Sequence, residues 1–257
     1  MSLAAPLLGL VAGQAVLLPR RYGASPALAP VDVMVAPSGG VLNTPAVVEM
    51  AAFGDSAMAG VGVHHVEECL PVQLAHRVAD SMGRAVHVVG YARSGARTLD
   101  VLTRQIPRVW QAPDVSVLVV GTNDVTGVTT PAKLAGSLSA LLDALVSLGA
   151  PVVMSSLPEF RAMRLLPHPL MEAVLGYGAV IGAVQRHAVA DRPRVLLVDV
   201  ARGVGSEFVN DEANMSADSF HPSAAGYGRI ADALAPAVLS VLGTAQNIAE
   251  TSDHEPE

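Results

Sequence analysis

The segment VVEMAAFGDS, residues 47–56, joins a largely apolar run to a turn sequence and a serine. An apolar run of this length, ended by turn residues, predicts a β-strand that is buried on both faces. Such strands occur in parallel sheets that helices cover on both sides. Ligands of open parallel sheets bind beyond the carboxyl ends of the strands, so the position of Ser56 predicts a functional side chain.

The same kind of apolar run recurs along the chain. It predicts further strands at residues 86–91, 115–120, 152–155 and 195–200. Apolar residues at helical spacing predict helices over residues 67–82, 98–110, 131–148, 169–190 and 221–242. Strands that alternate with helices predict an α/β fold, with a parallel sheet between two layers of helices.

The composition indicates one domain. The chain has 257 residues, of which 51% are hydrophobic and 15% charged, and this length suits a single sizeable core. We place the domain at residues 46–242. The formal charge is −7 and the chain has no basic stripe, which argues against a nucleic-acid partner. Cys69 is the only cysteine, so an internal disulfide is excluded.

Three segments lie outside this domain. Residues 3–18 are apolar apart from Gln14, but the run is shorter than the ~20 residues of a spanning helix, and no basic residue precedes it. Residues 1–21 could therefore form a membrane anchor, a signal-like sequence or a packed helix, and the sequence does not decide between these three. Membrane association is left undecided as well, and so is a location at the cell envelope or in the cytoplasm. Residues 22–45, rich in Pro and Gly, predict a linker. Residues 243–257 predict a disordered acidic tail.

A later motif supplies partners for Ser56. Asp218 and His221 form an Asp-x-x-His pair just before the last predicted helix. A serine hydroxyl becomes a nucleophile when a base removes its proton, and an imidazole held by a carboxylate is such a base. With this spacing the carboxylate can accept from imidazole Nδ1, which leaves Nε2 free to face the serine. The three residues therefore predict a catalytic triad.

Three hydrogen-bond donors follow predicted strands. They are the backbone N–H of Ser56, the backbone N–H of Gly95 and the carboxamide of Asn123. An acyl-transfer transition state needs donors that are aimed at the developing oxyanion. All three lie at carboxyl ends of strands and can converge on one rim, so they predict an oxyanion hole.

The set Gly54-Asp55-Ser56, Gly95, Gly121-x-Asn123-Asp124 and Asp218-x-x-His221 resembles the SGNH (GDSL-type) hydrolases, over about residues 46–242. Segments 54–63 and 220–227 are similar to actinobacterial esterases of that family. The resemblance implies a flavodoxin-like three-layer α/β/α fold with a five-stranded parallel sheet, and esterase or lipase activity without a metal or other cofactor. It makes Ser56 the nucleophile, His221 the base and Asp218 the residue that orients it. It also places Gly95 and Asn123 in the oxyanion hole.

Other polar residues have simpler interpretations. Asp55 and Asp124 are expected to accept hydrogen bonds that stabilise their turns. His64 and His65 point apart on a regular element, and no further ligand accompanies them at metal-binding spacing, so no metal site is predicted. Segment 157–170 either lines the substrate pocket or is a plain surface loop. No substrate-binding residue is assigned.

The primary hypothesis is a serine esterase that forms an acyl-enzyme on Ser56 and acts on a small-molecule, lipid or saccharide ester. The sequence contains no evident lid or extra domain, which favours short acyl chains such as acetyl or butyryl. An acyltransferase would use the same residues with another acceptor. A further alternative is a catalytically silent module that binds a saccharide or lipid, but such a module would not need to keep all of the catalytic residues. A flavodoxin-type nucleotide binder would need a phosphate-binding glycine loop, which the chain lacks.

Overall fold

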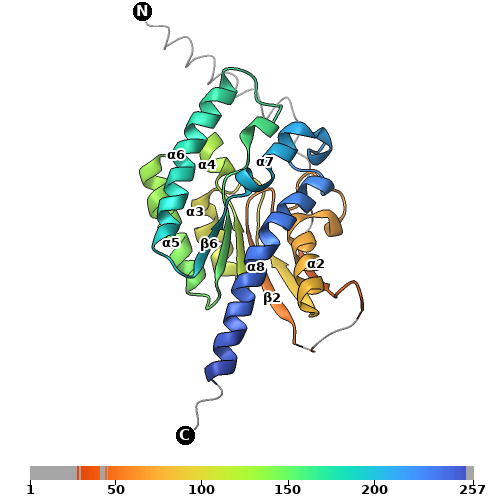
Figure 1. Ribbon diagram of the computed structural model, residues 1–257. Helices are drawn as coiled ribbons and strands as arrows, with labels where there is room; N and C mark the ends of the chain where they lie inside the picture. The colour runs from red at the N-terminus through yellow and green to blue at the C-terminus, as the bar shows by residue number, and fades with distance from the viewer. Residues whose placement is uncertain (1–27, 29, 41–43, 45, 253–257) are drawn as a thin grey trace, which may run out of the picture.

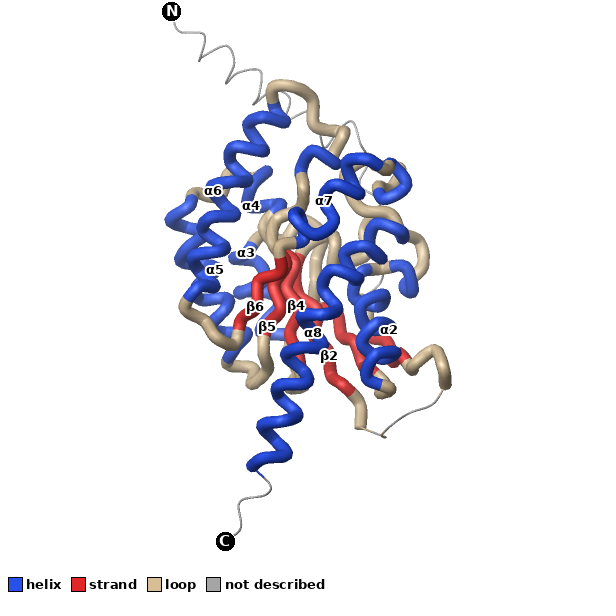
Figure 2. The backbone as a smooth tube through the Cα atoms, viewed as in Figure 1, coloured by secondary structure: helices blue, strands red, loops and turns tan. Residues whose placement is uncertain are grey.

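A six-stranded sheet with helices on both faces forms the centre of the protein (Figures 1 and 2). The computed structural model describes residues 28, 30–40, 44 and 46–252. The strand order is β1-β3-β2-β4-β5-β6. The strands are β1 (Asp32–Val35), β2 (Val48–Gly54), β3 (Val86–Gly90), β4 (Val115–Val119), β5 (Val152–Ser155) and β6 (Val195–Val198). The expected three-layer α/β fold is confirmed.

The sheet has one strand more than expected. Strands β2 to β6 pair in parallel, as predicted for five strands, whereas β1 pairs antiparallel with β3. β1 lies within residues 22–45, so the expectation of a linker is wrong for residues 32–35. The physical reason is burial: Val31 and Val35 enter the core, and the strand between them satisfies its backbone groups on the free edge of β3.

Strand β2 explains why the opening segment is apolar on both of its faces. Met50 and Ala52 belong to the hydrophobic core on one face of the sheet, and Ala51 and Phe53 belong to the core on the other. Successive side chains of a strand point to opposite faces, so a strand between two cores is largely apolar on both faces. The exception in β2 is Glu49, which is half-buried and lies 2.8 Å from His87.

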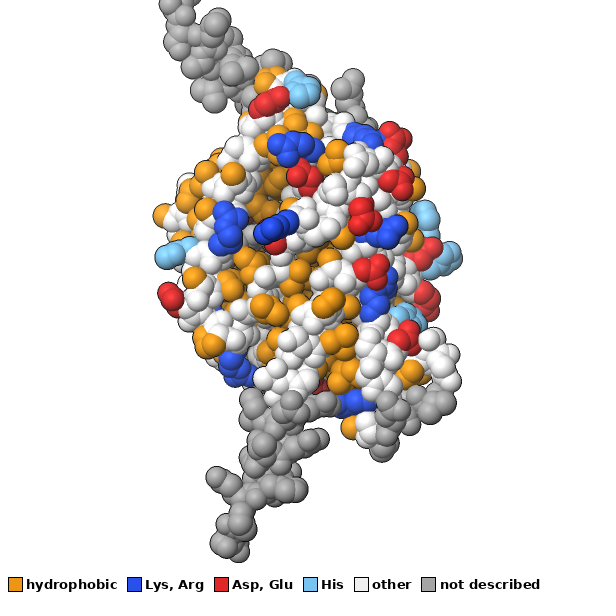
Figure 3. All heavy atoms as spheres, in the orientation of Figure 1, with side chains coloured by type: hydrophobic (Ala, Val, Ile, Leu, Met, Phe, Trp, Pro, Cys, Tyr) orange, Lys and Arg blue, Asp and Glu red, His pale blue; other side chains and the backbone are white. Residues whose placement is uncertain are grey.

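The long helices form the two outer layers. On one face, α2 (Leu70–Met82) packs beside α8 (Ala224–Ser252), and on the other α5 (Pro131–Val146) packs beside α6 (Leu170–Ala190) (Figure 1). The shorter helices are η1 (Val66–Glu68), α3 (Thr98–Asp100), η2 (Val101–Gln105), η3 (Ile106–Arg108), α4 (Thr122–Thr126), η4 (Phe160–Ala162), α7 (Val200–Asn210) and η5 (Glu212–Asn214). In the view of Figure 3, hydrophobic side chains gather in the middle of the face around edge strand β6, and basic side chains are interspersed with acidic ones.

Two helical expectations need correction. Residues 98–110 do not form one α-helix but pass from α3 into a π-helical turn, η2, and a 3₁₀ turn, η3. Pro107 lacks the N–H that a continuous helix would use, so the regular ladder ends there. The last helix continues to Ser252, into the segment 243–257 that was expected to be disordered. Ala, Gln and Glu in that segment favour helix.

The apolar N-terminal segment, residues 3–18, lies outside the described residues. Among the helices that the structure does describe, none combines the length and the apolar character that crossing a bilayer requires.

Candidate active site

Ser56, His221 and Asp218 form one hydrogen-bonded chain at the carboxyl end of the sheet. His221 Nε2 lies 3.0 Å from Ser56 Oγ, and His221 Nδ1 lies 2.7 Å from Asp218 Oδ2. A carboxylate can only accept, so the proton of the second bond belongs to Nδ1, and Nε2 accepts from the serine hydroxyl. The structure thus brings together the three residues that the sequence predicted as a triad.

The loop before α8 holds Asp218 and His221 in place. Met215 and Pro222 pair as an antiparallel bridge that closes this loop. Asp218 Oδ1 accepts from one serine hydroxyl and two backbone N–H groups of the same loop, at 2.8–2.9 Å. Burial raises the pKa of Asp218, but the hydrogen bonds from His221 and the loop outweigh burial and hold this pKa well below its usual range. Asp218 is therefore a carboxylate at any ordinary pH.

Ser56 follows β2 through a turn that requires glycine. Gly54 has a φ of +147°, and a Cβ atom there would lie 2.0 Å from the carbonyl oxygen of Val119. The next residue, Asp55, is buried and accepts from the backbone N–H of Ala57 at 3.1 Å. Burial raises the pKa of Asp55 to about 6. This carboxyl group thus makes the turn-stabilising bond that was expected of it.

The buried side-chain amide of Gln105, which belongs to no recognisable sequence motif, stabilises the same turn by hydrogen bonds. Gln105 Nε2 donates to the carbonyl oxygen of Gly54 at 2.7 Å, and Gln105 Oε1 accepts from the N–H of Gly54 at 3.0 Å. Gln105 is the last residue of η2, and only 2% of it is exposed. One side chain thus pairs with both backbone groups of the residue that sets the direction of the serine turn. The available signal in the sequence was a lone glutamine in an apolar helical pattern, two residues before Pro107.

The other two predicted donors lie on loops that follow the neighbours of β2. Gly95 follows β3, and Asn123 lies in the first turn of α4, after β4. Asn123 Nδ2 donates to the carbonyl oxygen of Ala96 at 3.1 Å. The buried Asp124 accepts from the N–H and the hydroxyl of Thr98, at 2.9 and 2.8 Å. These bonds fasten the two loops to each other, and Asp124 supports the turn as expected.

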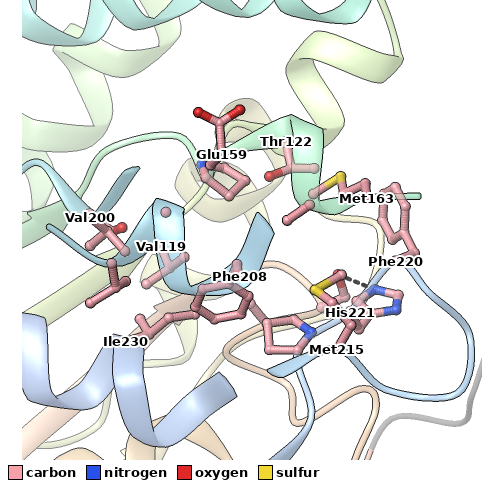
Figure 4. A pocket seen from close by; sticks show the side chains of 18 of the residues that line it. Val119, Thr122, Glu159, Met163, Val200, Phe208, Met215, Phe220, His221 and Ile230 are labelled. Atoms are coloured by element: carbon pink, nitrogen blue, oxygen red, sulfur yellow. Dashed lines mark hydrogen bonds between the residues drawn. The ribbon is translucent and has the colours of Figure 1, made fainter. Parts of the chain in front are cut away.

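An apolar cavity of about 90 Å³ lies beside Ser56 and His221 (Figure 4). Its wall is largely made of the side chains of Val119, Met163, Val200, Phe208, Met215 and Ile230. Segment 157–170 contributes several residues between 158 and 163, so it is not a plain surface loop. Gly95 and Asn123 are not among the residues that line the cavity.

The paired histidines, His64 and His65, lie on the surface. Their backbone N–H groups donate to the carboxylate of Glu68, at 3.2 and 3.1 Å. Within the residues that the structure describes, no three side chains of His, Cys, Asp or Glu are grouped so that they could hold a metal ion.

Comparison with known proteins places this chain in a family. Residues 52–229 match the model of the GDSL-like lipase/acylhydrolase family, which is more than half of the chain. The chain belongs to this family. It is therefore a carboxylic ester hydrolase of the esterase and lipase kind. The match covers all of the blocks from Gly54-Asp55-Ser56 to Asp218-x-x-His221.

Individual relatives agree with the family assignment. The chain is 28% identical over 245 residues to the GDSL-like esterase Rv1075c of Mycobacterium tuberculosis, across 91% of this chain and 77% of that protein. The structure resembles that of TesA, with a TM-score of 0.58 and 25% identity over 75% of this chain and 99% of that one. It also shares its fold with a family 3 carbohydrate esterase of Clostridium thermocellum, with a TM-score of 0.60 and 21% identity over 77% and 98% of the two chains.

Proposed function

We propose that the protein is a serine esterase that cleaves carboxylic esters through an acyl-enzyme on Ser56. The observation that carries the proposal is the unbroken chain from Asp218 through His221 to Ser56, which lies beside an apolar cavity. Family membership supports ester hydrolysis, and this chain of hydrogen bonds supports the route by which it occurs.

In the first half-reaction, Ser56 Oγ attacks the carbonyl carbon of the ester while His221 Nε2 takes the hydroxyl proton. The tetrahedral intermediate collapses, the bond to the alcohol oxygen breaks, and His221 returns the proton to the departing alcohol. In the second half-reaction His221 removes a proton from water, which attacks the acyl carbon. The second tetrahedral intermediate collapses, the bond to Ser56 Oγ breaks, and His221 returns the proton to Oγ as the acid leaves. Asp218 keeps the imidazole in the Nδ1–H tautomer and stabilises the imidazolium form.

The negative charge of each tetrahedral intermediate needs hydrogen-bond donors. We assign this role to the backbone N–H groups of Ser56 and Gly95 and to Asn123 Nδ2. The bonds of Asn123 to Ala96 and of Asp124 to Thr98 support the assignment, because they fix the two donor loops before substrate binds. Preorganised donors need no rearrangement during the reaction, which is what makes them effective.

The test compares the full chain with its Ser56→Ala variant, using p-nitrophenyl butyrate for turnover and a fluorophosphonate probe for labelling. Ser206→Ala, which changes an exposed serine of α7, is the matched control. We expect that only Ser56→Ala loses both turnover and labelling. Equal turnover by that variant would refute the proposal. A folded protein that labels without hydrolysing any ester would be an acyltransferase, and one that does not label would be a silent binding module.

A further inference from the structure

Helix α7 forms one wall of the cavity beside Ser56. Val200, Val204 and Phe208 are spaced four residues apart, so they share one face of the helix, and all three are buried and line the cavity. The Asp199 side chain caps the helix by accepting from the N–H of the third residue into it, at 3.1 Å. Helix α7 is therefore a well-packed wall of the cavity.

A glycine lets this helix approach the segment after β5. A Cβ atom at Gly205 would lie 2.8 Å from the Cβ of Glu159, too close for any other residue without a shift of the backbone. Glu159 and Met163 line the cavity from that segment. Helix α7 and residues 158–163 thus pack against each other and together form part of the cavity wall.

The shape of the cavity suits a linear apolar group. In Figure 4, His221 lies at one end and Val200 and Ile230 lie at the other, with Phe208 in between. Its volume of about 90 Å³ is several times the ~15 Å³ that one water molecule needs on the same measure. A saccharide would lose hydrogen bonds to water at this apolar wall without gaining partners, whereas an aliphatic chain gains by leaving water.

The position of the cavity assigns it to one side of the ester. Gly95 and Asn123 do not line the cavity, although Thr122, next to Asn123, does, so the assigned oxyanion donors do not open into the cavity. The acyl group stays attached to the serine while the alcohol leaves and water enters. An apolar cavity walled by helix α7 therefore fits the group that stays, and a solvent-exposed side fits the group that exchanges.

We propose that this cavity binds the acyl chain, and that the preferred substrates carry a linear aliphatic acyl group longer than butyryl. The proposal rests on the serine esterase function proposed above and names its substrate class. It departs from the expectation of acetyl or butyryl esters, which depended on the lack of a lid. Helix α7 provides an apolar wall for the acyl chain without a separate lid.

The first experiment varies the two sides of the ester separately, with the full chain. p-Nitrophenyl acetate, butyrate, hexanoate, octanoate and dodecanoate vary the acyl chain, and methyl, butyl and octyl acetate vary the alcohol. We expect kcat/KM to rise by about fourfold for each methylene that enters the cavity, and to fall once the chain outgrows it. The alcohol series should show no comparable rise. A rise with alcohol length but not with acyl length would overturn the assignment.

The second experiment fills the cavity from α7. Val204→Phe adds bulk inside it, and Ser206→Phe adds the same bulk on the exposed face of the same helix. The ratio of kcat/KM for octanoate to that for acetate should fall in Val204→Phe and stay constant in Ser206→Phe. Since Val204→Phe could fail to fold, Ile230→Ala provides the converse test, because a longer cavity should move the optimum to longer acyl chains. An unchanged optimum in Ile230→Ala would count against the proposal.

A failure of this proposal can be told apart from a failure of the esterase function. Turnover that depends on Ser56 but is flat in acyl length would refute the acyl cavity and leave the esterase standing. If no ester is turned over, binding of intact p-nitrophenyl octanoate and acetate to the Ser56→Ala variant, measured by calorimetry, decides the matter. Equal affinity for the two esters would refute the acyl cavity, and tighter binding of octanoate would support it.

Discussion

Replacing Gln105 tests whether one amide side chain holds the serine turn. Gln105→Leu has a similar size but cannot pair with the N–H or the carbonyl group of Gly54. The Gly54 carbonyl oxygen keeps its bond from the N–H of Arg93, at 3.2 Å, so the variant leaves the N–H of Gly54 without the partner that Gln105 supplies. One buried polar group without a partner should lower the free energy of unfolding by about 1–3 kcal/mol. This is a measurable part of the roughly 5–15 kcal/mol that a domain of ordinary stability has. kcat should also fall, because the turn places Ser56 at 3.0 Å from His221 Nε2.

The measurement is urea denaturation, with a comparison of midpoints at an unchanged slope. Gln185→Leu is the matched control, because Gln185 is equally buried but makes one hydrogen bond, from Nε2 to the carbonyl oxygen of Val120 at 3.0 Å. Gln185 Oε1 has no hydrogen-bond partner, so Gln185→Leu also removes a buried unsatisfied acceptor and should cost less than Gln105→Leu.

Gln105→Glu adds a pH readout to the same test. Its carboxyl group can donate to the Gly54 carbonyl only while protonated, and burial favours the protonated form in the folded state. Stability of this variant should therefore fall as pH rises through the pKa of the new carboxyl group. A Gln105→Leu protein as stable as its parent, or a Gln105→Glu protein without this pH dependence, would refute the reasoning.

The other predictions concern the triad, the oxyanion hole and the sheet. Asp218→Asn should keep the fold but lower kcat by about 10⁴, because the amide favours the wrong imidazole tautomer; near-normal turnover would remove Asp218 from the triad. Asn123→Ala should lower kcat by about 10²–10³ with little change in KM, as for a lost oxyanion donor; an unchanged kcat would exclude that role. His87 lies 2.8 Å from both Asp32 and Glu49, and the bond to Asp32, followed by that to Glu49, raises its pKa. Its contribution to stability should be complete below pH ~6.5 and lost as pH rises through the higher folded-state pKa, so the unfolding free energy of His87→Gln should approach that of the parent at alkaline pH. A constant difference between the two proteins across this range would contradict the prediction.

The candidate triad could be predicted from the sequence because each part of it is local. Ser56 stands directly after a strand that has to be apolar on both faces, and Asp218 and His221 are only three residues apart. Once the parallel strands are recognised in the sequence, the polar residues at their carboxyl ends can be identified as candidate site residues. The central parallel strands are recognisable as apolar runs, since they lie between two cores.

Features that depend on tertiary packing could not be predicted in the same way. The sequence of α7 contains Gly203 and Gly205, which disfavour helix, and the helix forms because its apolar face covers the cavity. Strand β1 is short and lies among prolines and glycines, so only its partner β3 defines it. The role of Gln105 depends on the π-helical turn that aims it, and no spacing rule reveals such a turn.

The loop that carries Asp218 and His221 has a consequence for how activity returns during refolding. The acid and the base are close in sequence and can pair within their own loop, but Ser56 is 165 residues from His221 along the chain. The serine comes within reach only when α8 docks on α2, where Gln73 donates to the Ala224 carbonyl at 2.8 Å. During refolding, turnover should therefore recover at the rate at which α8 docks on α2. A stopped-flow assay of enzyme activity would measure that docking rate directly.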